Sequence, residues 1–173
     1  YLSILDSTCI SSDTMTLNIH TPTKPVISGD SALCKGGDIV LTVSPNGSYV
    51  WSTGSLTDTI HVDKSGKYKV RLVNNWGCID STWRNVIFYP NPISNAGRDT
   101  TVLIGNPVML DGTNSQLANG YYWSVGYTSP TYLYNPQSDQ WITLTVTSVN
   151  GCMDIDSVLV RSEEHTSELQ SRL

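Results

Sequence analysis

Apolar and polar side chains alternate in short runs along most of the chain. The clearest runs are residues 38–43, 67–73 and 142–147, which carry an apolar residue at every second position. A period of two is typical of a β-strand that buries one face. Turn sequences separate the runs, and Asn150-Gly151 is the sharpest, because both residues tolerate the positive φ of a two-residue hairpin. With no helical period before residue 161, the pattern predicts an all-β, antiparallel sandwich architecture.

The same series of short motifs occurs twice in the chain. Residues 49–54 and 121–126 both read Y-x-W-S-x-G. Upstream of them, residues 34–41 align with 103–110, and downstream a Gly-Cys pair recurs. The matched positions are Gly36 with Gly105, Leu41 with Leu110, and Cys78 with Cys152. Several matched features in one order indicate an internal repeat rather than chance.

The repeat predicts how the chain is divided. Residues 1–20 resemble the end of a repeat, with Cys9 at the position of Cys78, so we expect the last two strands of a truncated module there. Whole modules are predicted over 26–90 and 93–160. Proline-containing segments precede each whole module and predict short, semi-extended linkers, because proline fixes φ and restricts the residue before it.

The last segment, 161–173, differs in composition from the rest. Glutamate occurs only at Glu163, Glu164 and Glu168. The segment reads RSEEHTSELQSRL and resembles the translation of a sequencing adapter. We therefore interpret 161–173 as a non-native tail, the alternative being a genuine C-terminal amphipathic helix.

Trp51 and Trp123 stand at the centre of the two Y-x-W-S-x-G motifs, between apolar or aromatic neighbours. A large aromatic at this place in a sandwich is most simply the core residue between two sheets. We predict both as core tryptophans, with a role in stacking on a ligand as the alternative.

Four cysteines are present, at positions 9, 34, 78 and 152. Cys34 and Cys78 lie near the two ends of the 26–90 module, and we predict a disulfide between them, with two free thiols as the alternative. Leu103 occupies the position of Cys34 in the second repeat, so Cys152 is expected to be a buried, unpaired thiol. The spacing does not fit a metal site. A disulfide would imply an oxidising, extracellular setting.

The sequence contains little that would indicate catalysis or a bound cofactor. No nucleophile elbow, zinc-binding helix motif or phosphate-binding loop occurs, and the aspartates stand beside turn residues, so we do not expect an enzyme. No cofactor is expected. Calcium is the one candidate metal, through four aspartates near one end of the second module, against the simpler interpretation of an acidic, solubilising rim. These residues are Asp99, Asp111, Asp154 and Asp156.

The second module is rich in tyrosine, with Trp141 close by in sequence. Uncharged, amphipathic rings are typical of surfaces that stack on sugar rings, and they also fill the poor core of a small sandwich. The candidate residues for contact with a glycan or a protein are Tyr121, Tyr122, Tyr127, Tyr132 and Tyr134.

Composition and charge narrow the classes of partner. The formal net charge is −5 and the pI about 4.9, which argues against nucleic-acid binding, since that requires a basic face. No run of 18 apolar residues is present, so no membrane insertion is expected, and no signal peptide is visible.

Four stretches in order, 34–41, 49–54, 68–70 and 150–160, resemble the immunoglobulin-like and PKD-like repeats of large bacterial surface proteins. Residues 96–101 resemble the segment that opens such a repeat. These repeats occur in bacteria that use the type IX secretion system, including proteins associated with gliding motility. The W-x-F-G-D-G motif of true PKD domains is absent. The resemblance covers about residues 1–160.

The resemblance implies a secreted or cell-surface protein of tandem modules that acts as an adhesive or structural spacer and contacts surface glycans, other proteins or its own neighbouring modules. A second hypothesis is a carbohydrate-binding accessory module of a secreted polysaccharide-degrading enzyme. The spacer hypothesis predicts largely buried tyrosines. The carbohydrate hypothesis predicts a coplanar, exposed aromatic strip on the second module.

Overall fold

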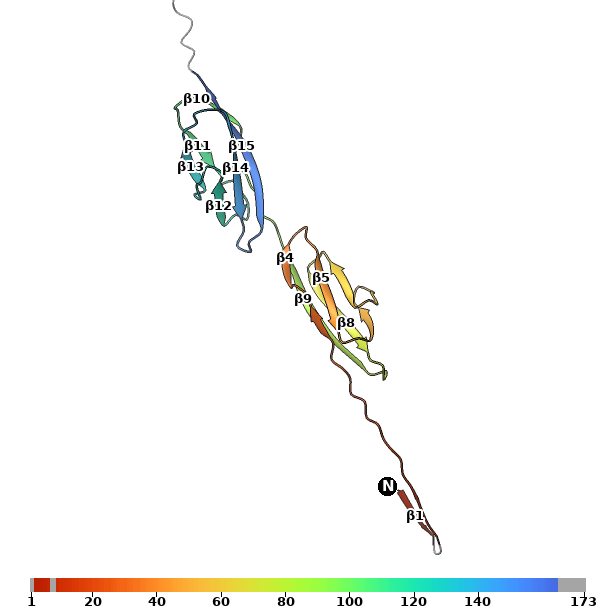
Figure 1. Cartoon of the computed structure of the whole chain (residues 1–173). Helices are drawn as coiled ribbons and strands as arrows, with labels where there is room; N and C mark the ends of the chain where they lie inside the picture. Colours follow the sequence, from red (N-terminus) through yellow and green to blue (C-terminus); the bar gives the residue numbers. More distant parts are fainter. Residues whose placement is uncertain (1, 7–8, 165–173) are drawn as a thin grey trace, which may run out of the picture. The chain divides into compact units, whose positions relative to one another are not determined.

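The computed structural model describes residues 2–6 and 9–164, and for residues 2–13 only the backbone is described. All regular structure in this part of the chain is β (Figure 1). Within the same residues, no helix is long and apolar enough to cross a membrane. The chain divides into two compact units, residues 1–31 with 38–86 and residues 32–37 with 87–173. At the N-terminal end, β1 (Leu2–Asp6) and β2 (Cys9–Asp13) form an antiparallel hairpin.

The first sandwich follows the predicted strand pattern. Its three-stranded antiparallel sheet has the order β3 (Val26–Ser28), β5 (Ile39–Ser44) and β7 (Thr59–Val62). Its four-stranded sheet has the order β4 (Ala32–Cys34), β9 (Ile79–Tyr89), β8 (Gly66–Val73) and β6 (Ser48–Trp51). Pairing in the second sheet is antiparallel, except that β4 runs parallel to β9. Leu41 and Val70, one from each sheet, are both fully buried.

The second sandwich repeats this plan. Its four-stranded sheet has the order β10 (Thr100–Leu103), β15 (Met153–Glu163), β14 (Gln140–Thr147) and β12 (Gly120–Trp123). Its other sheet pairs β11 (Val108–Asp111) with β13 (Thr131–Tyr134). As in the first sandwich, the sheet's one parallel pairing joins its first strand, β10, to its last, β15. Both sandwiches are therefore immunoglobulin-like all-β modules.

The two tryptophans occupy equivalent positions at the centres of the two sandwiches. Trp51 is 2% exposed and Trp123 is fully buried. Each indole N–H donates to a backbone carbonyl six residues later, Trp51 to Thr57 at 2.8 Å and Trp123 to Ser129 at 3.0 Å. A buried indole needs such an acceptor, because an unpaired polar group in a core is costly. The internal repeat is thus a structural repeat.

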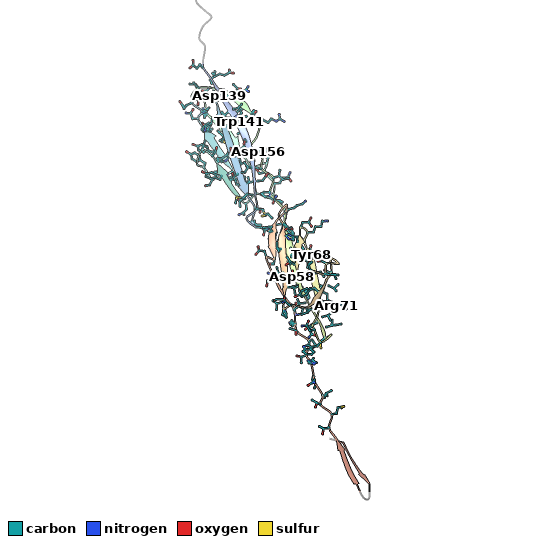
Figure 2. All side chains as sticks on the ribbon, turned by 45° about the vertical axis from the view of Figure 1, so that its right-hand side comes forward. Asp58, Tyr68, Arg71, Asp139, Trp141 and Asp156 are labelled. Carbon is teal, nitrogen blue, oxygen red and sulfur yellow. A yellow bond between two sulfur atoms is a disulfide. The ribbon has the colours of Figure 1, made fainter. Side chains whose placement is uncertain are left out.

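A tyrosine corner is present in the first sandwich. The Tyr68 hydroxyl, at the start of β8, donates to the Lys64 carbonyl at 2.8 Å. Burial, with a smaller effect of the nearby Asp63 carboxylate, raises the pKa of Tyr68, so the neutral hydroxyl that donates this bond is favoured. Figure 2 labels Tyr68 on this sheet.

Strand β15 runs past the boundary that the composition places at residue 160. Arg161, Ser162 and Glu163 pair in parallel with β10, and the Ile104 N–H donates to the Glu163 carbonyl at 2.9 Å. The Ser162 N–H also donates to the Asp139 carboxylate at 2.8 Å. Because a strand needs only backbone pairing here, the first residues of the tail extend the sheet whatever their origin. Residues 165–173 lie outside the described residues.

We expect two truncations to separate the tail from the sheet. Removal of 165–173, which leaves all described strands in place, should change the free energy of unfolding by less than about 0.5 kcal/mol. Removal of 161–173 should cost about 2–3 kcal/mol, since several ladder hydrogen bonds worth about 1 kcal/mol each are lost. Urea unfolding of both truncated chains measures the difference. Equal stabilities would show that the end of β15 contributes nothing.

Candidate functional site

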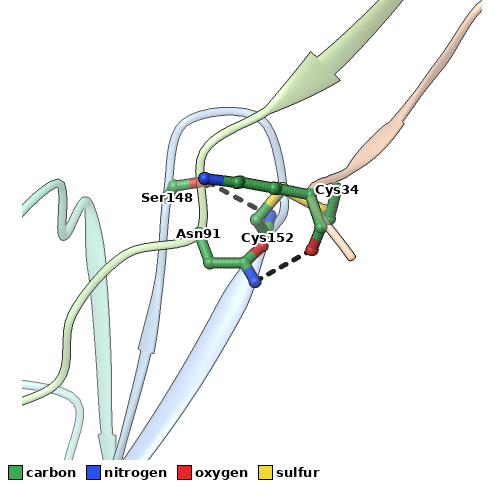
Figure 3. The surroundings of a disulfide bond; sticks show 5 residues. Cys34, Asn91, Ser148 and Cys152 are labelled. Atoms are coloured by element: carbon green, nitrogen blue, oxygen red, sulfur yellow. Dashed lines mark hydrogen bonds between the residues drawn. A yellow bond between two sulfur atoms is a disulfide. The ribbon is translucent and has the colours of Figure 1, made fainter. Parts of the chain in front are cut away.

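One disulfide joins the two sequence repeats. Cys34, the last residue of β4, is bonded to Cys152, with their Cα atoms 5.6 Å apart and 118 positions apart in sequence (Figure 3). The segment that carries Cys34 belongs, with Cys152, to the second compact unit. Cys152 is 1% exposed, so the bond is shielded from solvent reductants on that side.

The predicted bond between Cys34 and Cys78 is wrong. Cys34 pairs with Tyr89 at the last position of β9, whereas Cys78 immediately precedes the first residue of that 11-residue strand. At about 3.3 Å per residue, the strand holds the two Cα atoms on the order of 35 Å apart. A disulfide requires them within about 7 Å. Cys78 is a free thiol, and Cys152, which was predicted to be unpaired, supplies the second sulfur.

Hydrogen bonds fix the backbone on both sides of the disulfide. In the turn before β15, the Cys152 N–H donates to Ser148 Oγ at 3.2 Å and the Ser148 N–H donates to the Cys152 carbonyl at 2.8 Å. On the other side, the Asn91 side-chain amide donates to the Lys35 carbonyl at 3.1 Å (Figure 3). The two cysteines are therefore held by ordered backbone rather than by loose loops.

The five candidate tyrosines do not share one face. Tyr121, Tyr132 and Tyr134 are half-buried and pack against the core of the second sandwich. Tyr122 follows Tyr121 along β12 and therefore points to the opposite side of the sheet, where it is 52% exposed. Tyr127 is exposed and stacks on Tyr132, with ring centroids 3.4 Å apart. The coplanar strip that the carbohydrate hypothesis requires is not formed by these five residues.

The stacked pair is also linked electrostatically. Hydrogen bonding by Tyr127 is the main reason why the pKa of Tyr132 is raised above its usual value near 10. A raised pKa means that the folded state favours the neutral phenol. The interaction is therefore fully present below pH 10 and is lost as the pH rises through the raised value. Tyr132 therefore packs against the core of the second sandwich as a neutral phenol at neutral pH.

A different set of side chains forms an exposed apolar surface on the second unit. Along β14, Ile142, Leu144 and Val146 are buried, so the threonines between them point away from the core. The Cα register places Tyr122 beside Thr145 and Thr145 beside Ile155. We call this surface the outer face; its members are Tyr122, Trp141, Thr143, Thr145, Thr147, Met153 and Ile155.

The outer face exposes several large apolar side chains. Trp141, labelled in Figure 2, is 60% exposed, and Met153 and Ile155 are 63% and 62% exposed. Exposed apolar side chains that share one face of a sheet can form a contact surface. In sequence, Trp141 stands out only as a neighbour of the tyrosines, although the apolar-Thr alternation over 142–147 already indicates which side of β14 it occupies.

Three of the aspartates considered for calcium accept hydrogen bonds from backbone N–H groups. Asp154 accepts the Ser94 N–H and Asp156 accepts the Ala96 N–H, both at 2.8 Å. Asp99 accepts the Leu159 N–H at 2.9 Å. Asp154 and Asp156 alternate along β15, so both point to the same side of the sheet and together hold the segment of Ser94 and Ala96 against it. Figure 2 labels Asp156.

The fourth aspartate, Asp111, is engaged locally. Thr113 donates to its carboxylate through both Oγ1 and the backbone N–H, and the side-chain bond is the main reason why the pKa of Asp111 is lowered. Asp111 and Asp156 line an open cleft of about 630 Å³ on the second unit. Among the residues that the structure describes, no group of three or more His, Cys, Asp or Glu side chains is placed to hold a metal ion.

Comparisons with known proteins give structural likenesses only. No family model matches the chain. No curated protein matches it either. Two of the similar solved structures are immunoglobulin tandems: DIP-gamma IG1+IG2 (TM-score 0.35, 10% identity, 83% of this chain and 99% of that one) and Sidekick-1 immunoglobulin domains 1–5 (TM-score 0.34, 12% identity, 82% and 40%).

A further similar structure is SGBP-B of a Bacteroides ovatus mixed-linkage glucan utilization locus, in complex with a mixed-linkage heptasaccharide. Its TM-score is 0.28 and its identity 20%, over 80% of this chain and 48% of that one. The chain thus spans less than half the length of this protein and of the Sidekick-1 fragment.

Proposed function

We propose that the chain is a pair of non-catalytic, immunoglobulin-like modules that serve as a structural and adhesive spacer in a secreted or cell-surface bacterial protein. The Cys34–Cys152 disulfide is the observation that carries this proposal. Such bonds persist in oxidising, extracellular compartments. This bond connects positions 118 apart, so a load applied to the two ends of the chain does not stretch the residues between Cys34 and Cys152.

Adhesion would use the outer face. Its exposed Trp141, Tyr122 and Ile155 offer flat apolar area, and the threonine hydroxyls between them offer hydrogen bonds. Surfaces of this kind suit contact with another protein, because aromatic residues contribute large contact area at a low entropic cost. The bacterial surface setting rests on the resemblance of the repeat motifs.

The second candidate function, carbohydrate binding, is favoured by the same surface. An indole and a phenol ring on one sheet face can stack on sugar rings while hydroxyls bind the sugar's polar edge. The binding residues would then be Trp141 and Tyr122, rather than the group of five tyrosines.

A binding experiment separates the two functions. The Tyr122→Ala and Trp141→Ala variants are compared with the parent chain for retention on insoluble and soluble polysaccharides. Trp83→Ala is the matched control, since Trp83 is 52% exposed but lies on β9 of the first sandwich. The spacer function predicts equal, negligible retention for all four proteins. A tenfold loss of glycan affinity in the first two variants alone would establish carbohydrate binding instead.

A further inference from the structure

Cys78, a free thiol, stands in a turn that is built like the turn of Cys152. The Cys78 N–H donates to Asn74 Oδ1 at 2.9 Å, as the Cys152 N–H donates to Ser148 Oγ at 3.2 Å. Each turn contains a glycine with positive φ just before the cysteine, 77° at Gly77 and 79° at Gly151. In one of two equivalent turns the cysteine is disulfide-bonded, and in the other it is a thiol.

The surroundings of Cys78 also correspond to those of Cys152, which is bonded to Cys34. The alignment that places Gly36 on Gly105 places His20 on Tyr89. Tyr89 is the ladder neighbour of Cys34, the residue that bonds to Cys152. Correspondingly, the Cys78 thiol donates to the His20 carbonyl at 3.5 Å. Cys34 lies beside Tyr89 in the β4–β9 pairing. A cysteine that lay beside His20 in the same way would be next to Cys78.

The chain before His20 indicates independently that a strand partner belongs there. Met15, Leu17 and Ile19 alternate with polar residues but are 86%, 74% and 80% exposed. The same alignment places Leu17 on Val86, which is 2% exposed within β9. Residues 14–20 thus carry the sequence of the end of a β9-type strand, and they belong to none of the described strands.

We propose that Cys78 forms a disulfide with the cysteine of a β4-like segment from a preceding repeat of the same kind, which pairs in parallel with residues 18–20. The pairing would follow that of Ala32, Leu33 and Cys34 with the last three residues of β9. This inference extends the proposed spacer function by naming its partner. The bond ties the repeat that contains Cys78 covalently to the one before it.

The chemistry is an ordinary thiol oxidation. The two cysteine thiols lose two protons and two electrons and form one S–S bond. A disulfide-bearing thiol oxidoreductase takes up both electrons and both protons and becomes a dithiol. In the second repeat Leu103 occupies the position of Cys34, so this repeat has no cysteine to offer in the same way to a repeat that follows it.

The test is a chain in which one repeat is duplicated, residues 1–89 followed directly by 21–173. This places the first copy's Cys34 before the second copy's Cys78. After oxidation, non-reducing peptide mapping should show these two residues linked and iodoacetamide labelling lost at the second copy's Cys78. The first copy's Cys78 should stay fully labelled, and Cys34→Ser in the first copy should restore labelling of the second. Full labelling of the second copy's Cys78, in a chain whose Cys34–Cys152 bond has formed, would overturn the proposal.

A second measurement does not depend on folding of the duplicated chain. A peptide with the sequence of residues 31–38, whose cysteine carries a thiopyridyl leaving group, is added to the Cys9→Ser form of the parent chain. Cys78 should displace the thiopyridone about tenfold faster from this peptide than from a scrambled peptide with its cysteine at the same place. Equal rates would contradict a specific pairing site. Neither measurement depends on whether the outer face binds protein or glycan.

Discussion

Pulling the oxidised chain by its two ends is expected to release about 400 Å less extension than pulling the Cys152→Ser variant. The disulfide fixes residues that are 118 positions apart, and an extended chain spans about 3.4 Å per residue. With the bond intact, the force runs from Cys34 through the sulfur atoms to Cys152. Strands β5 to β14 lie between these residues and therefore do not contribute to the extension.

Single-molecule force spectroscopy of the full chain measures this difference as a change in total contour length. Cys34→Ser should behave as Cys152→Ser does, because either change removes the bond. Cys78→Ser is the matched control and should leave the extension of the oxidised chain unchanged, since Cys78 is a free thiol. A contour length that does not depend on Cys34 or Cys152 would show that the bond does not bear load.

The same bond should stabilise the chain at equilibrium. In the chain-entropy description, a disulfide that closes a loop of about 100 residues lowers the entropy of the unfolded state. This raises the free energy of unfolding by about 4.7 kcal/mol. This is an upper figure for the present chain, because two compact units need not unfold together. The stabilising bond is therefore not confined to the 26–90 module, as the predicted Cys34–Cys78 pairing would have required.

The fold could be predicted from the sequence because its signals are local and repeated. The period of two at residues 142–147 reports a single buried face, and the structure places Ile142, Leu144 and Val146 there. The repeated Y-x-W-S-x-G motif likewise reflects one local geometry: an indole that bonds to a carbonyl six residues later. Short-range patterns of this kind can be recognised in a single sequence without knowing which strands pair.

The disulfide could not be predicted in the same way, because it depends on the length and direction of β9. The predicted pairing of Cys34 with Cys78 assumes that each repeat is self-contained. The parallel pairing of β4 with the far end of β9 separates Cys34 from Cys78. The sequence does contain one signal. Leu103 leaves Cys152 without a cysteine partner in its own repeat. If Cys78 is set aside, Cys34 is the nearest upstream cysteine, and it stands at the position that Leu103 occupies in the second repeat.

The candidate contact residues were predicted only in part, because neighbouring residues of a strand point to opposite sides. Tyr121 and Tyr122 stand side by side in sequence, yet one packs against the core and the other lies on the outer face. A group of aromatic residues in sequence is therefore not a group in space until the strand that carries each residue is placed. Trp141 joins Tyr122 only through the register of β12, β14 and β15.

The largest effect of a single substitution on stability is expected at Trp123. Trp123→Ala should lower the free energy of unfolding of the second sandwich by about 3–5 kcal/mol, as loss of a buried aromatic side chain leaves a cavity. The variant also leaves the Ser129 carbonyl without its 3.0 Å donor. Trp123→Phe should cost less, because most of the apolar contact remains and only the hydrogen bond, worth about 1 kcal/mol, is lost with the remaining volume.

Trp141→Ala is the matched control for this prediction, because it removes the same side chain from the same sheet on the opposite face. Trp141 is 60% exposed, whereas Trp123 is fully buried. The control should change the free energy of unfolding by no more than about 0.5 kcal/mol. Urea unfolding followed by far-ultraviolet circular dichroism measures all three variants without relying on tryptophan fluorescence. Equal losses for Trp123→Ala and Trp141→Ala would mean that Trp123 is not the core of the sandwich, since burial is the physical difference between the two sites.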